Sequence, residues 1–329
     1  MNTTATATAT APAPAPAARL RLSVRVLGNL SVRRGTTTLD AAGLGGPKPR
    51  QILEILVLNL GSPVSKDQLV DTIWAGRPPA EGTATLESYV SVLRRHLQPG
   101  AGRTGPLRTT TGGYVLDRDA VDLDLDDFDA ALRAGEAAAD PDTAYAHVVE
   151  ALRLGSATLL ADEVRPSWVQ AARDLHAARV HGARVRAAEL AVGTGRFAAA
   201  VGWARSAVED DVLDERAWCL LIRALELDGR PAEGLRAYER CRRVLERELG
   251  CAPGPQLQAT FVRLLQTTAD GADDFSQALA ALLAIQEQLS RASDVAPDAA
   301  RPVAPAVRET LRAAGTVVDS FLRRALAFT

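Results

Sequence analysis

TATLESYVSVLRRHL at residues 83–97, followed by RTTTGGYVL at residues 108–116, is the part of the sequence that decides the fold. The first stretch predicts a helix, because apolar residues recur at spacings of four, three and four on one face, namely Leu86, Val90, Leu93 and Leu97. The second stretch predicts a β-hairpin, because its paired glycines allow a tight turn. A helix followed by such a hairpin is typical of a winged helix, so the pair favours a DNA-binding protein over an enzyme.

The face of this helix opposite the apolar stripe is small and polar and ends in a cation. It carries Ala84, Ser88, Ser91 and Arg95. Small residues allow close approach to a groove floor, and an arginine can bond phosphate or guanine. Thr83 and Thr85 are well placed to cap the helix start, where free N–H groups also suit a phosphate. An ordinary amphipathic surface helix has the same pattern, so the neighbouring segments must decide between the two interpretations.

Two further helices and a strand region are predicted upstream of this stretch. Residues 49–60, PRQILEILVLNL, are too apolar for a fully exposed helix, and residues 65–74, SKDQLVDTIW, begin with a capping box formed by Ser65 and Gln68. Residues 20–40 alternate as strands whose apolar side chains point one way: Leu20, Leu22, Val24 and Val26. The predicted order is strands, three helices and a hairpin.

This order resembles the OmpR-type winged helix, and in particular the N-terminal domain of the Streptomyces antibiotic regulatory proteins. The resemblance rests on PKPRQILEILVLN, VSKDQLVDTIW, TLESYVSVLRRHL and TTGGYVL, which follow one another in that order. With the helical region described below, it covers roughly residues 20–266. The resemblance implies a transcription regulator and no enzymatic activity.

Charge is divided unevenly along the chain. Residues 19–120 hold 14 Lys or Arg and 8 Asp or Glu, a formal charge of +6, whereas the whole chain is −2. A basic module joined to an acidic one is therefore hidden by a near-neutral total. The basic module has a long-range reason to bind a polyanion, although many domains that do not bind nucleic acid carry as much charge.

The second half of the chain contains an internal repeat. GRFAAAVGWARSAVE begins at Gly195 and GRPAEGLRAYERCRR at Gly229, an offset of 34 residues, which is the period of tetratricopeptide repeats. Small residues recur where the paired helices of such repeats touch: Ala200, Ala207, Gly234 and Cys241. Because two copies are too few for a free-standing array, further helices are predicted at 124–139, 142–154, 166–192 and 255–267.

This half resembles the partner domain of the same family, the bacterial transcriptional activation domain, through ALRLGSATLLADEV, GRPAEGLRAYERCRRVLERELG and PGPQLQ. The expected fold class is mostly α: a winged helix with a small sheet, three helices and a hairpin wing, followed by an all-α tetratricopeptide-like domain. The expected domains are a disordered leader at 1–18, the winged helix at 19–118, the helical domain at 121–267 and a helical tail at 268–329. Two amphipathic helices are predicted in that tail, at 276–292 and 307–327.

Composition and motifs argue against an enzyme, a metalloprotein and a membrane protein. The three cysteines have no paired spacing, so neither a disulfide framework nor a zinc site is expected, and the expected compartment is the reducing cytoplasm, on the nucleoid. His176 and His181 have the wrong spacing for a zinc pair, and Pro47 interrupts a faint likeness to a phosphate loop. Residues 1–18 lack the features of a signal peptide, and no long apolar stretch follows. No cofactor is expected.

The resemblance implies how the chain would act. The helix at 83–97 would lie in the major groove of double-stranded DNA, with the hairpin as a wing on the neighbouring minor groove or backbone. The implied DNA contacts are Lys48, Arg50, Thr83, Thr85, Ser88, Ser91, Arg94, Arg95, Thr110, Thr111 and Gly112. A homodimer would bind direct repeats and recruit RNA polymerase through the helical domain and the loop at 75–82, with Arg77 and Glu81 as contacts. The target genes would be an antibiotic or other secondary-metabolite cluster.

Two departures from the family pattern leave alternatives open. Related proteins usually carry a cation or an amide near positions 87 and 92, where this chain has Glu87 and Val92. Glu87 would repel phosphate unless it reads a cytosine amine or pairs with an arginine. The alternatives to an activator are a repressor on the same fold and a protein-binding tetratricopeptide scaffold. Because the leader is too short for a receiver domain, control by some other means is expected.

Overall fold

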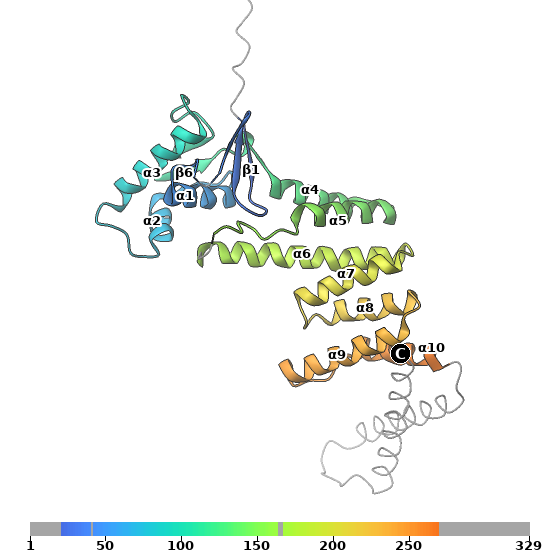
Figure 1. The fold of residues 1–329 in the computed structure, drawn as a ribbon. Helices are drawn as coiled ribbons and strands as arrows, with labels where there is room; N and C mark the ends of the chain where they lie inside the picture. Colours follow the sequence, from blue (N-terminus) through green and yellow to red (C-terminus); the bar gives the residue numbers. More distant parts are fainter. Residues whose placement is uncertain (1–20, 41, 164–166, 270–329) are drawn as a thin grey trace, which may run out of the picture. The chain divides into compact units, whose positions relative to one another are not determined.

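The computed structural model describes residues 21–40, 42–163 and 167–269 (Figure 1), and these form two compact units. The first unit extends to residue 137 and includes 146–180; the second holds 138–145 and the residues from 181 onward. Leu20, the leader and the predicted tail helices at 276–292 and 307–327 lie outside the described residues. In the described ranges no helix has both the length and the apolar character needed to cross a bilayer.

A four-stranded sheet begins the first unit. Its order is β3-β2-β1-β7, built from β1 (Leu22–Arg25), β2 (Ser31–Arg34), β3 (Thr37–Leu39) and β7 (Val121–Leu123). The predicted alternation is confirmed, since Leu22, Val24 and Val26 expose at most 1% of their surface. β7 joins parallel to β1, and the Asp124 carboxylate then accepts from the N–H groups of Val26 and Leu27. The sheet is therefore completed by residues beyond the predicted winged-helix boundary at 118.

Three helices and a hairpin follow, as the sequence predicts, and the hairpin pairs with a short strand, which was not predicted, to form a second, three-stranded sheet (Figure 1). The helices are α1 (Pro47–Leu58), α2 (Lys66–Trp74) and α3 (Gly82–Leu97), and the sheet has the order β4 (Val64–Ser65), β6 (Gly113–Leu116), β5 (Leu107–Thr110). The predicted apolar stripe of α3 is buried, with 1% or less of each side chain exposed: Leu86, Val90, Leu93 and Leu97. α1 begins two residues earlier than predicted, because Pro47 fits the first helical turn.

The starts of α2 and α3 differ in their capping. The Ser65 hydroxyl accepts from the N–H of Gln68 at 3.1 Å, which confirms the predicted cap of α2. The predicted threonine cap of α3 is wrong, because the helix begins at Gly82 without a side-chain cap. Gly82 is buried against Pro78 and Val70, which fixes the helix start there and leaves Thr85 inside the first turn. The Thr85 hydroxyl donates back to the Glu81 carbonyl at 2.9 Å instead.

The remaining helices of the first unit pack around a contact between two aromatic rings. They are α4 (Asp124–Ala137), the later part of α5 (Pro141–Gly155) and the start of α6 (Ser167–Gly193). The Phe128 ring is fully buried, 5.1 Å from the His176 ring, in space that a side chain at Gly155 would fill. His176 Nε2 lies 2.7 Å from the Gly155 carbonyl, and burial lowers the pKa of its imidazole. The predicted helices at 124–139, 142–154, 166–192 and 255–267 are confirmed to within two residues.

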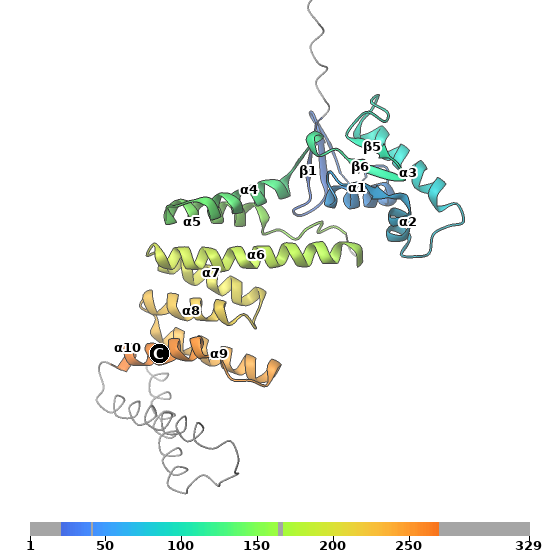
Figure 2. The same ribbon diagram turned by 180° about the vertical axis from the view of Figure 1, so that it is seen from behind.

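The second unit contains the predicted repeat. After the end of α6 it consists of α7 (Phe197–Asp210), α8 (Glu215–Leu227), α9 (Pro231–Leu249) and α10 (Pro255–Ala269), and α7, α8 and α9 stack in chain order in both views (Figures 1 and 2). Gly195 and Gly229 make the same turn, each with a φ of 74°. The small residues expected at helix contacts are all buried: Ala200, Ala207, Gly234 and Cys241. Equivalent turns and contacts at one period confirm the repeat.

Candidate nucleic-acid interface

The exposed face of α3 is the one that the sequence predicts. Ala84, Ser88, Ser91 and Arg95 are all exposed. The Ser88 hydroxyl donates to the Ala84 carbonyl at 3.1 Å, which holds it close to the helix. Within the described ranges no hydrogen bond or ion pair engages the Arg95 guanidinium. This face is therefore low in relief, and its one long side chain is a free cation.

Glu87 on the same helix is paired with a cation from α2. The Lys66 ammonium lies 2.5 Å from the Glu87 carboxylate, and this hydrogen bond and charge lower the pKa of the Glu87 carboxyl. The partner is a lysine and not the arginine that the sequence interpretation required. Since the charge of Glu87 is compensated within the protein, the residue no longer argues against an anion on this face.

Val92, the second departure from the family pattern, faces the protein. It is partly buried, and a side chain at Gly45 would overlap its Cγ1 atom. Val92 thus covers the loop that leads into α1. A cation at position 92 would lie against this loop, so its absence removes nothing from the exposed face of α3.

Arg94 joins α3 to the wing. Its Nη2 donates to the Thr109 hydroxyl at 2.7 Å and its Nε to the Leu107 carbonyl at 3.2 Å. The guanidinium also lies 5.6 Å from the centroid of the Tyr114 ring, which is buried under the wing. Burial lowers the pKa of Arg94. The predicted phosphate contact is therefore a side chain that already fixes the distance between helix and hairpin.

The wing turns at Thr111 and Gly112, which are both exposed. Gly112 has a φ of 79°, and its carbonyl accepts from the Lys66 N–H at 2.9 Å, so the turn is tied to the start of α2. Thr110 differs from the other predicted wing contacts, because its hydroxyl oxygen is buried and has no hydrogen-bond partner in the described part of the chain. The accessible tip is therefore formed by Thr111 and Gly112.

A hollow of about 600 Å³ lies between the end of α3 and the wing. The side chains that line it include four cations, namely Lys66, Arg94, Arg95 and Arg103, and a single described carboxylate, Glu87. Lys66 and Arg103 were not among the predicted contacts. No local pattern marks them: Lys66 lies in the first turn of the helix predicted at 65–74, and Arg103 lies in the loop between the predicted helix at 83–97 and the hairpin. The hollow has the size and charge to hold a phosphate group.

Lys48 and Arg50, the two predicted phosphate contacts of α1, are engaged by the protein. The Lys48 ammonium donates to the Ile73 carbonyl at 2.6 Å and to Gln51 at 3.3 Å. Arg50, with 13% of its side chain exposed, lies 2.7 Å from Glu54 on the next turn of α1. The structure therefore holds both cations in internal contacts.

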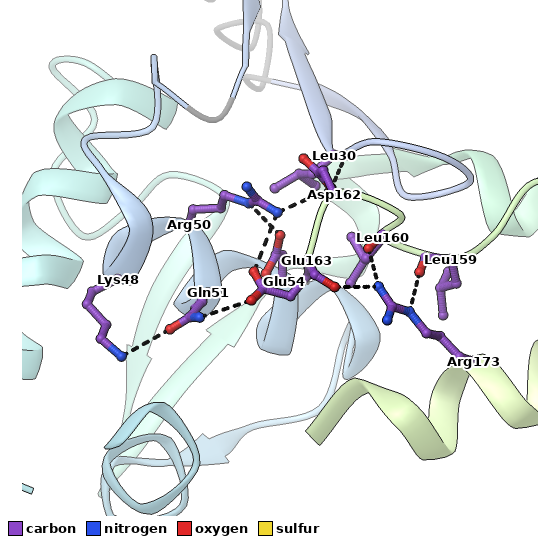
Figure 3. Close-up of polar contacts among 10 residues, drawn as sticks. All are labelled: Leu30, Lys48, Arg50, Gln51, Glu54, Leu159, Leu160, Asp162, Glu163 and Arg173. Atoms are coloured by element: carbon purple, nitrogen blue, oxygen red, sulfur yellow. Dashed lines mark hydrogen bonds and ion pairs between the residues drawn. The ribbon is translucent and has the colours of Figure 1, made fainter. Parts of the chain in front are cut away.

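The contacts of Arg50 reach across the chain to the segment after α5 (Figure 3). Its Nη2 lies 3.2 Å from Asp162 and 3.5 Å from Glu163. The Glu54 carboxylate is fully buried, and its Oε2 has no hydrogen-bond partner among the described residues. Burial raises the pKa of Glu54 to about 7, with Arg50 opposing the shift and the other two carboxylates adding to it. We call these four residues the Arg50 cluster.

Backbone contacts fix the segment that carries Asp162 and Glu163. Leu27 and Leu159 form an isolated β-bridge, and the N–H of Leu30 donates to Asp162. Arg173 at the start of α6 donates to carbonyls of the same segment, including those of Leu159 at 2.8 Å and Glu163 at 3.0 Å (Figure 3). The first compact unit therefore includes this segment as well as the winged helix.

The loop between α2 and α3 presents both predicted polymerase contacts. Arg77 and Glu81 are exposed, and the Arg77 N–H donates to the Trp74 carbonyl at 3.0 Å. α2 ends at Ala75 in the left-handed conformation, with a φ of 51°. The Trp74 ring stacks on Tyr89 of α3, with 6.3 Å between centroids. The loop is thus anchored at both ends and free along its outer edge.

Two segments of the chain match described families. Residues 44–116 match "Transcriptional regulatory protein, C terminal", and residues 123–265 match "Bacterial transcriptional activator domain". The regulatory protein DnrI of Streptomyces peucetius is 30% identical over 64% of this chain and 81% of DnrI. The regulatory protein AfsR of Streptomyces griseus is 32% identical over 73% of this chain, which spans only 24% of AfsR.

A solved structure has a similar fold. It is Mycobacterium tuberculosis EmbR in complex with a low-affinity phosphopeptide, at 32% identity and a TM-score of 0.68. The similarity covers 76% of this chain and 66% of the EmbR chain. The fold is therefore similar to that of a protein named as a transcriptional regulatory protein.

Proposed function

Because the chain belongs to the Streptomyces antibiotic regulatory protein family of transcriptional regulators, we propose that it binds specific DNA sequences and activates transcription from the promoters it binds. One observation carries the proposal: the serine face of α3 ends in the free cation Arg95 beside a hollow lined by cations, with the wing on its other side. This is the arrangement needed to place a helix in the major groove while phosphates are held at its edge.

We narrow the set of proposed DNA contacts to side chains whose polar groups are accessible. Ser88, Ser91 and Arg95 would face base edges or the adjacent backbone, and Thr83 and Thr85 would lie at the helix start near a phosphate. Arg103 joins them as a phosphate contact, with Thr111 and Gly112 at the wing tip, whereas Lys66 pairs with Glu87 and keeps that carboxylate from repelling phosphate. Lys48, Arg50, Arg94 and Thr110 act by holding the recognition surface in shape, since their polar groups are bonded or buried within the protein.

Activation requires contacts beyond DNA. We place RNA polymerase at the outer edge of the loop at 75–82, with Arg77 and Glu81 exposed there, and at the helical domain. Two protomers would bind direct repeats as a homodimer on DNA. By analogy with DnrI and AfsR, which are regulatory proteins of Streptomyces, the target would be an antibiotic or other secondary-metabolite cluster. The protein would regulate these genes in the cytoplasm, bound to the nucleoid.

Replacing Arg95 by alanine tests the recognition face. Arg95→Ala is expected to weaken specific DNA binding by about 1–3 kcal/mol and to make log affinity less steep in log salt, because one cation leaves the phosphate or base contact. Affinity is measured by gel shift on promoters from the chain's own gene neighbourhood, at several salt concentrations. Arg153→Ala removes the same charge from an exposed position on α5 and serves as the matched control, with no expected change in DNA affinity.

Unchanged affinity of folded Arg95→Ala would remove this residue from the interface. If the wild-type chain binds no promoter specifically, the proposed function is wrong. A protein-binding tetratricopeptide scaffold would then be the favoured alternative. In vitro transcription on a bound promoter then distinguishes activation, which raises transcript, from repression, which lowers it.

A further inference from the structure

A groove in the second compact unit is not used by the proposed DNA binding. It has a volume of about 760 Å³ and lies along α9 and α10. Apolar side chains form part of its lining, namely Val212, Leu235, Tyr238, Val244 and Phe261. The rings of Tyr238 and Phe261 stack with 4.0 Å between centroids and 11° between planes. The groove therefore presents an aromatic and aliphatic strip to whatever occupies it.

A row of four arginines borders this strip. Arg236, Arg240, Arg243 and Arg247 recur on α9 at spacings of four, three and four, and all are exposed. Glu239 is the one carboxylate lining the groove among the described residues, and it lies 3.3 Å from Arg243. Such exposed ion pairs contribute little energy, so the four arginines can still bind the carboxylates of another segment. A fitting occupant is a helix with an apolar stripe and carboxylates beside it.

The repeat indicates where such a helix should come from. α9 begins at Pro231, sixteen residues after α8 begins at Glu215. α10 packs on both of these helices, with Leu264 beside Gly234 and Phe261 on Tyr238, as the first helix of a third repeat would. The same spacing from Pro255 places the second helix of that repeat after residue 270. A third repeat would also meet the usual minimum for a stable array.

The chain continues from α10 with a sequence of the required chemistry. Residues 270–289, which lie outside the described residues, contain no Lys or Arg and four carboxylates: Asp270, Asp273, Asp274 and Glu287. Apolar residues recur in it at spacings of four, three and seven, namely Phe275, Leu279, Leu282 and Leu289. The segment starts next to the last described residue, Ala269, so no linker must be spanned.

We propose that residues 270–289 occupy the groove between α9 and α10 of the same chain as the second helix of a third repeat. Their apolar stripe covers Tyr238 and Phe261, and their carboxylates face the arginine row. An intramolecular occupant is favoured because its effective concentration is high when the tether is short.

Charge reversal in the full-length chain tests this occupant. Arg240→Glu with Arg243→Glu is expected to speed hydrogen exchange of α10 and of residues 270–289 by tenfold or more, because the carboxylates are then repelled. Adding Asp273→Arg and Asp274→Arg to the same chain is expected to restore slow exchange. The matched control reverses two exposed arginines elsewhere in this unit, Arg186→Glu with Arg223→Glu, and should leave both regions unchanged.

A second variant tests the apolar contact between residues 270–289 and the groove. Leu279→Asp with Leu282→Asp, which alters no described residue, is expected to speed exchange in α10 to the same extent. The proposal is overturned if these leucine changes leave α10 unaffected, or if the charge swap fails to restore protection. Protection of α10 that increases with protein concentration would assign the groove to a second copy and would also overturn it.

Discussion

Arg50→Ala is expected to destabilise the first compact unit by about 3–5 kcal/mol at pH 8, because it leaves the buried Glu54 carboxylate without the one ion partner that it has among the described residues. The same change releases Asp162 and Glu163 from α1 and loosens the segment after α5. Urea unfolding followed by hydrogen exchange in residues 47–58 measures the loss for this unit separately from the second. Arg25→Ala, at an exposed arginine of β1, is the matched control and should cost less than about 0.5 kcal/mol.

The effect of Arg50→Ala should depend on pH in a defined direction. The pKa of Glu54 is raised to about 7 in the folded chain, so folding takes up a proton between the ordinary carboxyl pKa and 7. The contribution of Glu54 to stability is therefore fully present below that ordinary value and is lost as pH rises towards 7. Without Arg50 the pKa rises further and the loss continues to higher pH, so the variant should be closest to wild type near pH 5.

A second substitution separates the ion pair from other effects of Arg50→Ala. Adding Glu54→Gln removes the buried charge and is expected to restore roughly half of the lost stability at pH 8. It should also flatten the pH dependence between 5 and 8. Equal destabilisation of the single and double variants at every pH would show that Arg50 acts through packing and not through charge.

Gly113→Ala is expected to cost about 3 kcal/mol or more and to abolish specific DNA binding. Gly113 of β6 lies opposite Ser65 of β4, and an added Cβ would overlap the Val64 carbonyl oxygen and come within 3.0 Å of the Ser65 Cα. These are backbone atoms in a paired strand and cannot move aside. β4 must therefore separate from β6, which detaches the wing from α2.

Gly112→Ala is the matched control for this substitution. The added methyl at Gly112 meets open space, but the φ of 79° makes it strained, at about 1 kcal/mol. Hydrogen exchange in residues 107–116 should therefore be fast in Gly113→Ala and nearly unchanged in Gly112→Ala. Comparable exchange in the two variants would contradict the close approach of β6 to β4.

The features that the sequence predicts correctly are local. The apolar stripe of α3, the Ser65 cap and the 34-residue repeat all depend on residues within a few turns of one another or on a fixed period. The exposed face with Ser88, Ser91 and Arg95 follows from the same helical period. Such patterns are determined by backbone geometry, so they can be predicted from the sequence without the tertiary structure.

The side-chain roles that could not be predicted from the sequence depend on partners far away along the chain. Arg50 meets Glu163 across 113 positions, and Glu87 meets Lys66 across 21, so neither pairing has a local signature. A cation near a helix start has the same pattern whether it bonds phosphate or a buried carboxylate. The missed start of α3 has a related cause, because burial of Gly82 against Pro78 and Val70 outweighs the capping preference of threonine.

Protection of promoter DNA by the full-length chain tests the central proposal most directly. Footprinting on promoters from its own gene neighbourhood is expected to show two protected direct repeats on one face of the duplex, about one helical turn apart, at low salt and with excess competitor DNA. Arg95→Ala should need a higher protein concentration than the wild type to give this protection, whereas Arg153→Ala should need the same concentration. Absence of any protected sequence with the folded wild-type chain, or equal protection by Arg95→Ala, would contradict recognition through α3.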